Sequence, residues 1–518
     1  MMKGIRTFKL LALLGVVLMG CVNAQKPKTN QKQPNILFIL SDDHTSQAWG
    51  VYGGKLKDFV QAPNISRLAD EGIVLDNCFC TNSICTPSRA AILTGQYSNK
   101  NKVYNLSHEL DRGRENVAKV LQKSGYQTAV VGKWHLYTKP AGFDYFNVLP
   151  GQGRYHNPLL KSEDSWEYGH EGGVEHKGFS TDVIADLSID WMKNRDKKKP
   201  FMMMCHFKAT HEPFDYPDRY KDLYKDIEIP EVESLFEFGR LSSGRTFDGQ
   251  TFEELAKRYT LNKKGDYPDM PFTTEGLDSV EVRKKVYQKL VKDFMRSGAA
   301  IDDNIGKLLK FLDDEGISDN TIVIYTADQG YYLGEHGFFD KRLMYEESLR
   351  MPFVIRYPEE VPANKRNKEL IQNIDFAPTL IDYAGIEVPV EMQGKSFRNN
   401  LIGKTPDDWR KAIYYRYWMH QVNRPAHFGI RNERYKLIFF YGSPLDFKKV
   451  SKKSTKPSWE FFDLKNDPNE MHNAYKDPKY AKIIKQMKLD LIKLREEAGD
   501  TDEQWPVMQE IISKHWDK

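Results

Sequence analysis

Two short apolar runs, far apart in the chain, each end in acidic and polar residues. The first, N-I-L-F-I-L, covers residues 35–40, and the second, T-I-V-I-Y, covers residues 321–325. The polar residues that follow them are Asp42, Asp43, Asp328 and Gln329. Continuous apolar runs of this length are typical of central parallel strands with both faces covered. They predict an open α/β sheet, whose ligands lie beyond the carboxyl ends of the strands. Solvated loop or cap residues remain the alternative for an isolated acid pair.

The composition is that of a globular protein large enough for one large and one smaller domain. The chain has 518 residues, against roughly 100 to 200 residues per domain. It is 40% apolar and 29% charged, so a sizeable core can form. The formal net charge of +4 is small for this length and gives no indication of a nucleic-acid partner. Five cysteines are too few to indicate a disulfide scaffold.

The first residues predict an export signal over residues 1–24. Three basic residues precede an apolar run at 10–20 that is too short to span a bilayer. The sequence L-M-G-C ending at Cys21 resembles a bacterial lipobox, whereas V-N-A ending at Ala24 resembles an ordinary signal-peptidase site. We favour the lipobox. The chain is therefore expected in the bacterial periplasm or as a membrane-anchored lipoprotein, with membrane contact only through an N-terminal lipid.

Residues 78–95 contain a cysteine at the start of a predicted helix. The stretch reads C-F-C-T-N-S-I-C-T-P-S-R-A-A-I-L-T-G. Thr86 is a candidate N-cap and Pro87 suits the first helical position, so Cys85 would lie at the positive end of the helix. A thiol or an anion is stabilised there. The alternatives are a small buried residue, or a metal knuckle with the two preceding cysteines, which lacks a fourth ligand at finger-like spacing.

The segment C-T-P-S-R followed by A-A-I-L-T-G resembles the C-x-P-S-R…L-T-G signature of type I sulfatases. In that family the cysteine is oxidised enzymatically to formylglycine (3-oxoalanine), whose hydrated aldehyde is the nucleophile. The resemblance therefore implies that Cys85 is modified, and that a sulfatase-maturating enzyme is a partner. It also implies a divalent site for Ca²⁺, with Mg²⁺ as the alternative. Its ligands would be Asp42, Asp43, Asp328 and Gln329.

Three further motifs extend the resemblance. They are G-K-W-H at 132–135, T-H-E-P-F at 210–214, and L-G-E-H-G…K…Y-E-E-S…R-x-P between 333 and 352. Thr210 departs by one position from the P-H-x-P-F of the family. Where Gln329 stands, the family often has Asn or His, and an amide oxygen serves equally as a ligand. The motifs carry over four active-site residues: Lys133, His135, His211 and Lys341.

The resemblance implies a sequence of chemical steps. One hydrate oxygen attacks sulfur, and the alcohol leaves with a proton from the side of His211 and Lys341. His135 then helps to deprotonate the remaining hydroxyl, which expels sulfate. Arg89 lies one helical turn after Cys85, so its guanidinium can reach the hydrate oxygens.

Other segments indicate a subgroup. The motifs at 82–85, 149–153, 344–352 and 459–464 look like those of bacterial N-acetylglucosamine-6-O-sulfatases that act on glycosaminoglycans or mucin glycans. This implies exo-acting 6-O-desulfation of a sulfated glycan. Uronate 2-O or galactose sulfates remain alternatives, as does a phosphoesterase of the same superfamily, although those enzymes usually have Ser or Thr as nucleophile. A lipoprotein that binds sulfated glycans through an unmodified cysteine is the non-enzymatic alternative.

The family fold is an α/β structure of alkaline-phosphatase type. It implies a catalytic domain at 34–392 with a large mixed sheet flanked by helices. A smaller C-terminal domain at 393–518 would contain a four-stranded antiparallel sheet and a helix. The amphipathic stretch at 478–498 is predicted to form this helix. Residues 217–279 are expected to form an insertion that shapes the substrate pocket or is purely structural. Sugar binding or packing are the alternatives for Trp418, His420 and His427.

Overall fold

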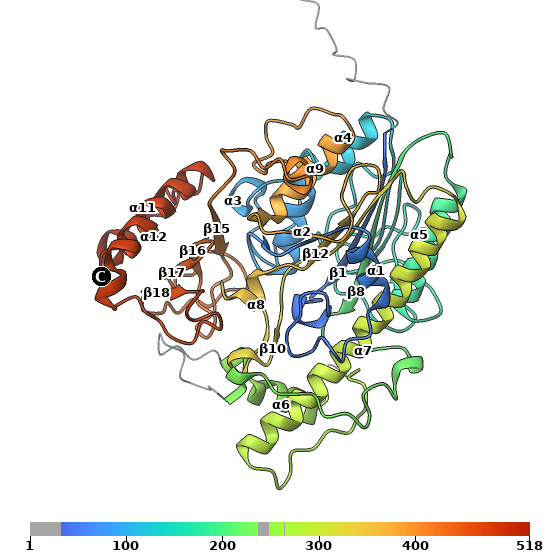
Figure 1. Ribbon diagram of the computed structural model, residues 1–518. Coiled ribbons are helices and arrows are strands. Elements are labelled where there is room, and N and C mark those ends of the chain that lie inside the picture. Colours follow the sequence, from blue (N-terminus) through green and yellow to red (C-terminus); the bar gives the residue numbers. More distant parts are fainter. Residues whose placement is uncertain (1–32, 237–247, 264) are drawn as a thin grey trace, which may run out of the picture. The chain divides into compact units, whose positions relative to one another are not determined.

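The computed structural model describes residues 33–236, 248–263 and 265–518 (Figure 1). The predicted signal segment, with both cleavage sites, lies outside the described residues. In the described ranges, every helix is too short or too polar to cross a bilayer.

The centre of the structure is an eight-stranded mixed sheet, which confirms the predicted fold class. Across the sheet the strands are β13 (Lys365–Asn367), β2 (Ile73–Leu75), β12 (Phe353–Arg356), β9 (Thr321–Ala327), β1 (Asn35–Asp42), β8 (Phe201–Thr210), β4 (Gln127–Lys133) and β5 (Tyr145–Leu149). The five strands from β9 to β5 are parallel, and β12 runs antiparallel to both of its neighbours. The apolar runs at 35–40 and 321–325 are therefore both central parallel strands.

Alternating side chains of β1 pack into two separate layers. Ile36, Phe38 and Leu40 face one core, and Leu37 and Ile39 face another, because successive residues of a strand point to opposite faces. The first layer contains α2 (Cys85–Thr94), α4 (Val117–Lys123) and α9 (Phe376–Tyr383), and the second contains α1 (Pro63–Asp70), α5 (Ser180–Asn194) and α7 (Ser279–Asp314). Helices thus cover both faces of the sheet (Figure 1).

The predicted insertion at 217–279 contains a helix that the sequence pattern did not indicate. This helix, α6 (Phe252–Thr260), has the hydroxyl of Thr251 as its N-cap. Its residues Leu255 and Tyr259 are fully buried in a third core together with Leu290 and Phe294 of α7. A helix of nine residues spans too few turns for its periodicity to stand out against the surrounding charged and turn residues.

A second, smaller sheet lies in the C-terminal part of the chain, as predicted. Its antiparallel strands are β15 (Ala412–Tyr417), β16 (His427–Asn432), β17 (Tyr435–Phe440) and β18 (Ser458–Asp463). The predicted final helix consists of a 3₁₀ turn at Pro478–Tyr480, capped by Asp477, and α11 (Ala481–Glu497). One further helix, α12 (Pro506–His515), was not predicted. The proposed domain boundary at 392/393 stays a prediction.

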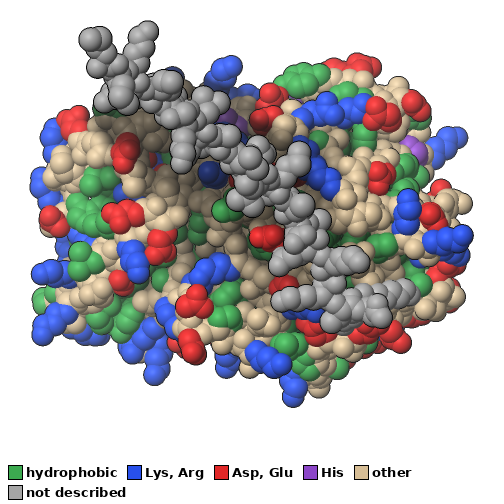
Figure 2. Space-filling view, turned by 90° about the horizontal axis from the view of Figure 1, so that it is seen from above, with side chains coloured by type: hydrophobic (Ala, Val, Ile, Leu, Met, Phe, Trp, Pro, Cys, Tyr) green, Lys and Arg blue, Asp and Glu red, His purple; other side chains and the backbone are tan. Residues whose placement is uncertain are grey.

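Shorter elements connect these layers. They are β3 (Cys78–Phe79), α3 (Ser98–Asn101), β6 (Leu159–Leu160), β7 (Val174–Glu175), β10 (Tyr332–Leu333), β11 (Phe339–Asp340), α8 (Glu346–Leu349), β14 (Ile371–Gln372) and α10 (Arg398–Leu401). On the face drawn in Figure 2, basic and acidic side chains are interspersed, as the small net charge suggests.

Candidate active site

Three carboxylates meet at the carboxyl ends of β1 and β9. Ser41 is in register with Ala327, so the residues that follow these two positions are neighbours. Carboxylate oxygens of Asp42, Asp43 and Asp328 all lie within 4.8 Å of one another. Asp43 has a positive φ of 68°, and its backbone N–H donates to Oδ1 of Asp328 at 3.2 Å. The predicted convergence of the two strand ends is therefore present.

The acid cluster is destabilised by burial and by its own charge. Burial raises the pKa of Asp43 to about 6, and burial together with Asp42 raises the pKa of Asp328 to about 7. Burial also opposes ionisation of Asp42, but Lys133 and His211 hold the pKa of this carboxyl well below its usual range. Crowded buried carboxylates of this kind are stabilised by a bound cation.

The amide of Gln329 completes an oxygen donor set. Its Nε2 donates to Asp43, and its Oε1 is buried without a hydrogen-bond partner among the described residues. An unpaired buried amide oxygen on a side chain that contacts Asp43 is suited to a hard divalent cation. The residues present thus fit the oxygen-ligated metal site that the sequence predicted.

Three basic side chains surround the acids. Arg89 donates from Nε to Oδ2 of Asp328 at 2.9 Å and from Nη1 to the carbonyl of Lys133 at 2.6 Å. Lys133, the last residue of β4, forms a buried ion pair with Asp42. The Nζ of Lys341 lies 2.6 Å from Oδ2 of Asp43. These contacts place a positive group beside each carboxylate, and they would also neutralise a bound anion.

The helix that carries Cys85 begins earlier than predicted. Cys85 is the first residue of α2, and the extended Ile84 is its N-cap, whose carbonyl accepts from the N–H of Ser88 at 3.1 Å. The prediction of Thr86 as the N-cap is wrong. Its hydroxyl instead donates to the carbonyl of His135 at 3.0 Å, which ties the helix to the loop after β4.

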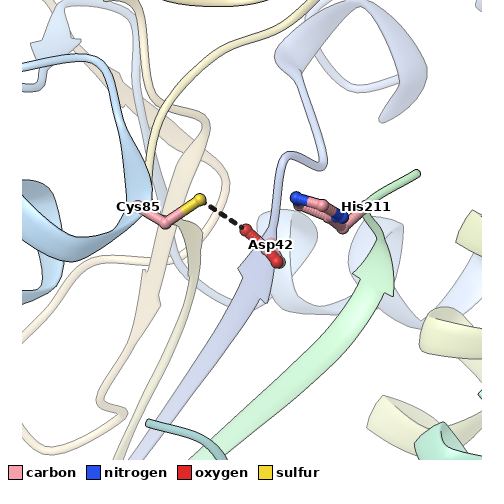
Figure 3. Close-up of side chains that lie close together, drawn as sticks. All are labelled: Asp42, Cys85 and His211. Carbon is pink, nitrogen blue, oxygen red and sulfur yellow. Dashed lines mark hydrogen bonds between the residues drawn. The ribbon is translucent and has the colours of Figure 1, made fainter. Parts of the chain in front are cut away.

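The thiol of Cys85 faces the acid cluster (Figure 3). Its Sγ lies 3.4 Å from Oδ1 of Asp42. Burial, followed by the carboxylate of Asp42, raises the pKa of the thiol, so the position at the helix start does not make it a thiolate. A carboxylate oxygen of Asp42, a ring nitrogen of His211 and this sulfur all lie within 4.8 Å of one another. The two other cysteines of the stretch, Cys78 and Cys80, are buried in the hydrophobic core.

His211 lies on the other side of Asp42 (Figure 3). It follows β8, and its Nε2 is 4.0 Å from Oδ2 of Asp43. Its Nδ1 lies 2.8 Å from the carbonyl of Glu212, which requires the proton on Nδ1 and leaves Nε2 directed towards the acids. The hydroxyl of Tyr155 donates to the carbonyl of His211 at 2.6 Å and holds this loop in place.

His135 adjoins the cluster, because burial and then Lys133 lower the pKa of its ring while Asp42 opposes them. It is buried, and its Nδ1 has no hydrogen-bond partner in the described part of the chain. The ring lies 6.1 Å from that of Tyr137 and lines a small separate cavity with Trp134 and His170. The predicted site residues are thus brought together around Asp42, with His135 at the edge of the group. Their chemical roles stay predictions.

A cavity of about 220 Å³ opens from Cys85. Of the predicted residues, Asp43, Cys85, His211 and Lys341 line it. Residues that the sequence reasoning missed also line it: Gln152, Glu212, Arg258, Tyr331, Asp340, Arg342 and Arg424. Several of these residues lie next to motif residues in the sequence, and that proximity could have identified them as candidates. No pattern pointed to Arg258 of α6.

The aromatic and histidine candidates near β15 and β16 do not line this cavity. Trp418, His420 and His427 are 1% exposed or less. Trp418 is packed under the guanidinium of Arg416, whose Cζ lies 3.6 Å from the ring centroid. Packing is therefore the structural role of these residues, and Arg424 of the same segment reaches the cavity instead.

The mixed sheet, with a buried acid cluster at its strand ends and a buried cysteine at the start of the adjoining helix, defines an α/β fold of alkaline-phosphatase type. The chain belongs to the sulfatase family. The family model "Sulfatase" matches residues 34–386, and the model "N-sulphoglucosamine sulphohydrolase, C-terminal" matches residues 334–497. The enzyme is therefore a sulfuric ester hydrolase.

Known relatives agree with this assignment. An N-acetylglucosamine-6-O-sulfatase of Bacteroides thetaiotaomicron is 40% identical over 97% of this chain and 93% of that protein. A protein solved in complex with its substrate D-glucosamine-2-N,6-O-disulfate has a TM-score of 0.80 and 35% identity, covering 92% of this chain and 100% of its own. A phosphonate monoester hydrolase from Silicibacter pomeroyi, at 20% identity and a TM-score of 0.68, shares the fold over 90% of this chain and 96% of its own.

Proposed function

We propose that this sulfatase removes the 6-O-sulfate of N-acetylglucosamine residues at the ends of glycosaminoglycan or mucin glycan chains. The observation that carries the proposal is the cavity of about 220 Å³ in which Cys85, His211 and Lys341 meet. It is smaller than the roughly 300–1,000 Å³ of ordinary ligand pockets, so it suits one terminal sugar and supports exo action. The names of the relatives described above support the choice of sugar.

The metal and the modified cysteine have separate roles in the proposal. A divalent cation, calcium or alternatively magnesium, is assigned to Asp42, Asp43, Asp328 and Gln329, and when bound it supplies a Lewis acid that polarises sulfate oxygens. Residue 85, after oxidation to formylglycine by a maturating enzyme and hydration, supplies an oxygen nucleophile. The fit of the oxygen donor set and the position of Cys85 facing Asp42 support both assignments.

The remaining residues bind charge and move protons. Lys133, Lys341 and Arg89 neutralise the sulfate and the charge that develops on its oxygens during transfer to residue 85. As the S–O bond breaks, the alcohol oxygen takes a proton from the side of His211 and Lys341: the ammonium of Lys341 carries one, and His211 donates from Nε2 when its ring is doubly protonated. His135 assists the later deprotonation at residue 85 that releases sulfate. For His211, the support is its fixed Nδ1 and its place in the cavity wall.

We also propose that the enzyme is exported. The support is the sequence of residues 1–24, with a basic start, an apolar run and the L-M-G-C segment. Lipidation of Cys21 would attach the protein to a membrane, and cleavage after Ala24 would leave it free in the periplasm. Labelling with a radioactive fatty acid in the native host separates these two forms.

The function is tested with a panel of defined sugars and the enzyme made in its own host. The panel contains 6-O-sulfated N-acetylglucosamine, a 2-O-sulfated uronate, a sulfated galactose and a phosphate monoester. We expect hydrolysis of the first, and peptide mass spectrometry should find formylglycine at residue 85. Preference for a different sulfated sugar would refute the specificity, preferred phosphate hydrolysis would favour a phosphoesterase, and an unmodified thiol would refute the nucleophile. The Cys85→Ala variant measures the background rate.

A further inference from the structure

The cavity is lined by more basic than acidic side chains. Two of the basic side chains each have a carboxylate partner of their own. Lys341 pairs with Asp43 at 2.6 Å. Arg258 contacts Glu212 at 3.0 Å and Glu254 at 3.2 Å.

The remaining cations share a single carboxylate. The Oδ2 of Asp340 lies 2.9 Å from Nε of Arg342 and 3.3 Å from Nη1 of Arg424. Its Oδ1 is 3.7 Å from Nζ of Lys341, which already pairs with Asp43. Among the described residues, Arg424 therefore pairs with Asp340 alone, at 3.3 Å, and this carboxylate also pairs with Arg342. The Nε of Arg424 is buried and has no hydrogen-bond partner in the part of the chain that the structure describes.

The environment of Arg424 is unfavourable for its own charge. Its side chain is 18% exposed. Burial, and then repulsion from Arg342, lower the pKa of its guanidinium. A partly buried cation with an unused donor loses part of its hydration, and the described side chains around Arg424 replace only some of it. A ligand anion in the cavity would supply both the missing charge and the missing acceptors.

The backbone holds Arg424 in this position. Gln421 and Arg424 exchange two N–H···O=C bonds of 3.1 Å each, which close a tight turn between β15 and β16. Gly249 lies against the tip of this turn, because a Cβ at that position would be 3.6 Å from Cζ of Arg424 and 2.5 Å from Nδ2 of Asn423. The guanidinium is thus presented to the cavity by a defined turn, which reduces the entropy lost on binding.

We propose that Arg424 binds a second sulfate group on the same sugar whose 6-O-sulfate is hydrolysed. Arg424 and Cys85 line one cavity of about 220 Å³, so an anion that reaches Arg424 belongs to the sugar residue that reacts. The Nε–H of Arg424 lacks a partner among the described residues and its Nη1 reaches Asp340 only at 3.3 Å, so the planar guanidinium can offer donors to a sulfate in a bidentate arrangement. A neutral acetamido group would leave the charge unpaired. This inference rests on the proposed function and makes doubly sulfated glucosamine the preferred substrate.

The test compares selectivity in the wild type, Arg424→Gln and Arg424→Lys. The substrates are 6-O-sulfated N-acetylglucosamine, N-sulfated 6-O-sulfated glucosamine, and 3,6-di-O-sulfated N-acetylglucosamine. A charge-assisted hydrogen bond contributes enough for us to expect a roughly 10- to 100-fold lower kcat/KM of Arg424→Gln on a disulfated sugar. The loss on the monosulfated sugar should be several-fold smaller. Arg424→Lys keeps the charge but lacks the planar guanidinium with its paired donors. Its kcat/KM on a disulfated sugar should lie between the values of the wild type and of Arg424→Gln.

The two disulfated sugars identify which sulfate is bound, and a selective loss on either supports the proposal. An equal loss on all three sugars would overturn it, as would wild-type selectivity in Arg424→Gln. The matched control is Arg434→Gln, an exposed arginine paired with Asp463 outside the cavity, which should behave as the wild type. Failure of the wild type to hydrolyse any of the sulfated sugars would instead refute the proposed function. Thermal unfolding of both glutamine variants confirms that they fold.

Discussion

At the scale of single residues, His211 is held with one nitrogen committed and the other directed at the cavity. Nδ1 is directed at the carbonyl of Glu212, and Tyr155 fixes the carbonyl of His211 itself. Glu212 is in turn held by Arg258 of α6 and by Tyr267. Nε2 is left facing the acids and the cavity. With Nδ1–H held by the carbonyl of Glu212, Nε2 is the nitrogen that can gain a second proton and pass it to a leaving alcohol.

The variant His211→Ala should therefore lose activity according to the leaving group. A sugar alcohol is a poor leaving group and needs a proton, so we expect its rate to fall by about 10²–10⁴, the usual contribution of a general acid. Activated aryl sulfates leave as stable phenolates, and their turnover should fall far less. Steady-state kinetics on both substrate types measures the difference. Equal losses would contradict the role, and His472→Ala, an exposed histidine outside the cavity, serves as the control.

Prediction from sequence succeeded at this scale where a residue belongs to a motif with a chemical reason. Asp42, Asp328 and Lys133 end buried strands, so their convergence followed from the strand pattern and from the family resemblance. Arg258 and Arg424 reach the same cavity from a short helix and a tight turn. Their positions depend on how α6 packs on α7 and how the turn between β15 and β16 closes, and neither contact has a local sequence signal.

At the scale of elements, α7 connects the central sheet with the insertion. Its C-terminal half packs in the second layer of the sheet, and its N-terminal half packs with α6 in the third core. The capping box between Asp278 and Glu281, which the structure contains, explains why the helix starts at Ser279. The apolar residues of this helix repeat at helical spacing in the sequence, but such a repeat does not indicate what the N-terminal half packs against.

A buried ion triad in α7 should make stability depend on pH. Asp293 is 2% exposed and contacts Lys289 and Arg296 at 2.8 and 2.9 Å, with Asp269 near the same guanidinium. Burial, opposed by Lys289, raises the pKa of Asp293 to about 6. The folded state therefore binds a proton more readily than the unfolded state. This contribution to stability is complete below the pKa of an aspartate in the unfolded chain, about 3.9, and is lost as the pH rises through the folded-state pKa of about 6.

The variant Asp293→Asn removes this titration. The free energy of unfolding of the wild type minus that of the variant should fall as the pH rises from about 4 to about 6, by on the order of 3 kcal/mol in total, and then stay constant. Denaturant unfolding at intervals across this range measures the difference. The exposed Asp314→Asn of the same helix should show no such window. A difference that is independent of pH would refute the raised pKa.

At the scale of the whole molecule, the acid cluster joins segments that are far apart in the chain. Asp42 and Asp43 lie at the end of β1, Asp328 follows β9, and Lys341 lies beyond β11. With the three carboxylates within 4.8 Å of one another, folding must bring like charges together in the core. Lys133, Lys341 and Arg89 offset part of this repulsion. A divalent cation would offset the rest, so binding of the metal should be coupled to the stability of the entire fold.

Added calcium should consequently raise the unfolding temperature of metal-stripped enzyme. A ligand that binds only the folded state stabilises it by about 2.7 kcal/mol at a concentration about 100 times Kd, and the shift should grow with the logarithm of the calcium concentration. Magnesium should produce a smaller shift if the site prefers calcium. Because the readout is thermal unfolding, it does not depend on activity or on the modification of Cys85. The Asp328→Asn variant removes one charged donor and should lose most of the shift, whereas Asp313→Asn, with a side chain 40% exposed and paired with Arg67 rather than with the cluster, should retain it. An unchanged shift in Asp328→Asn would mean that the cation binds elsewhere.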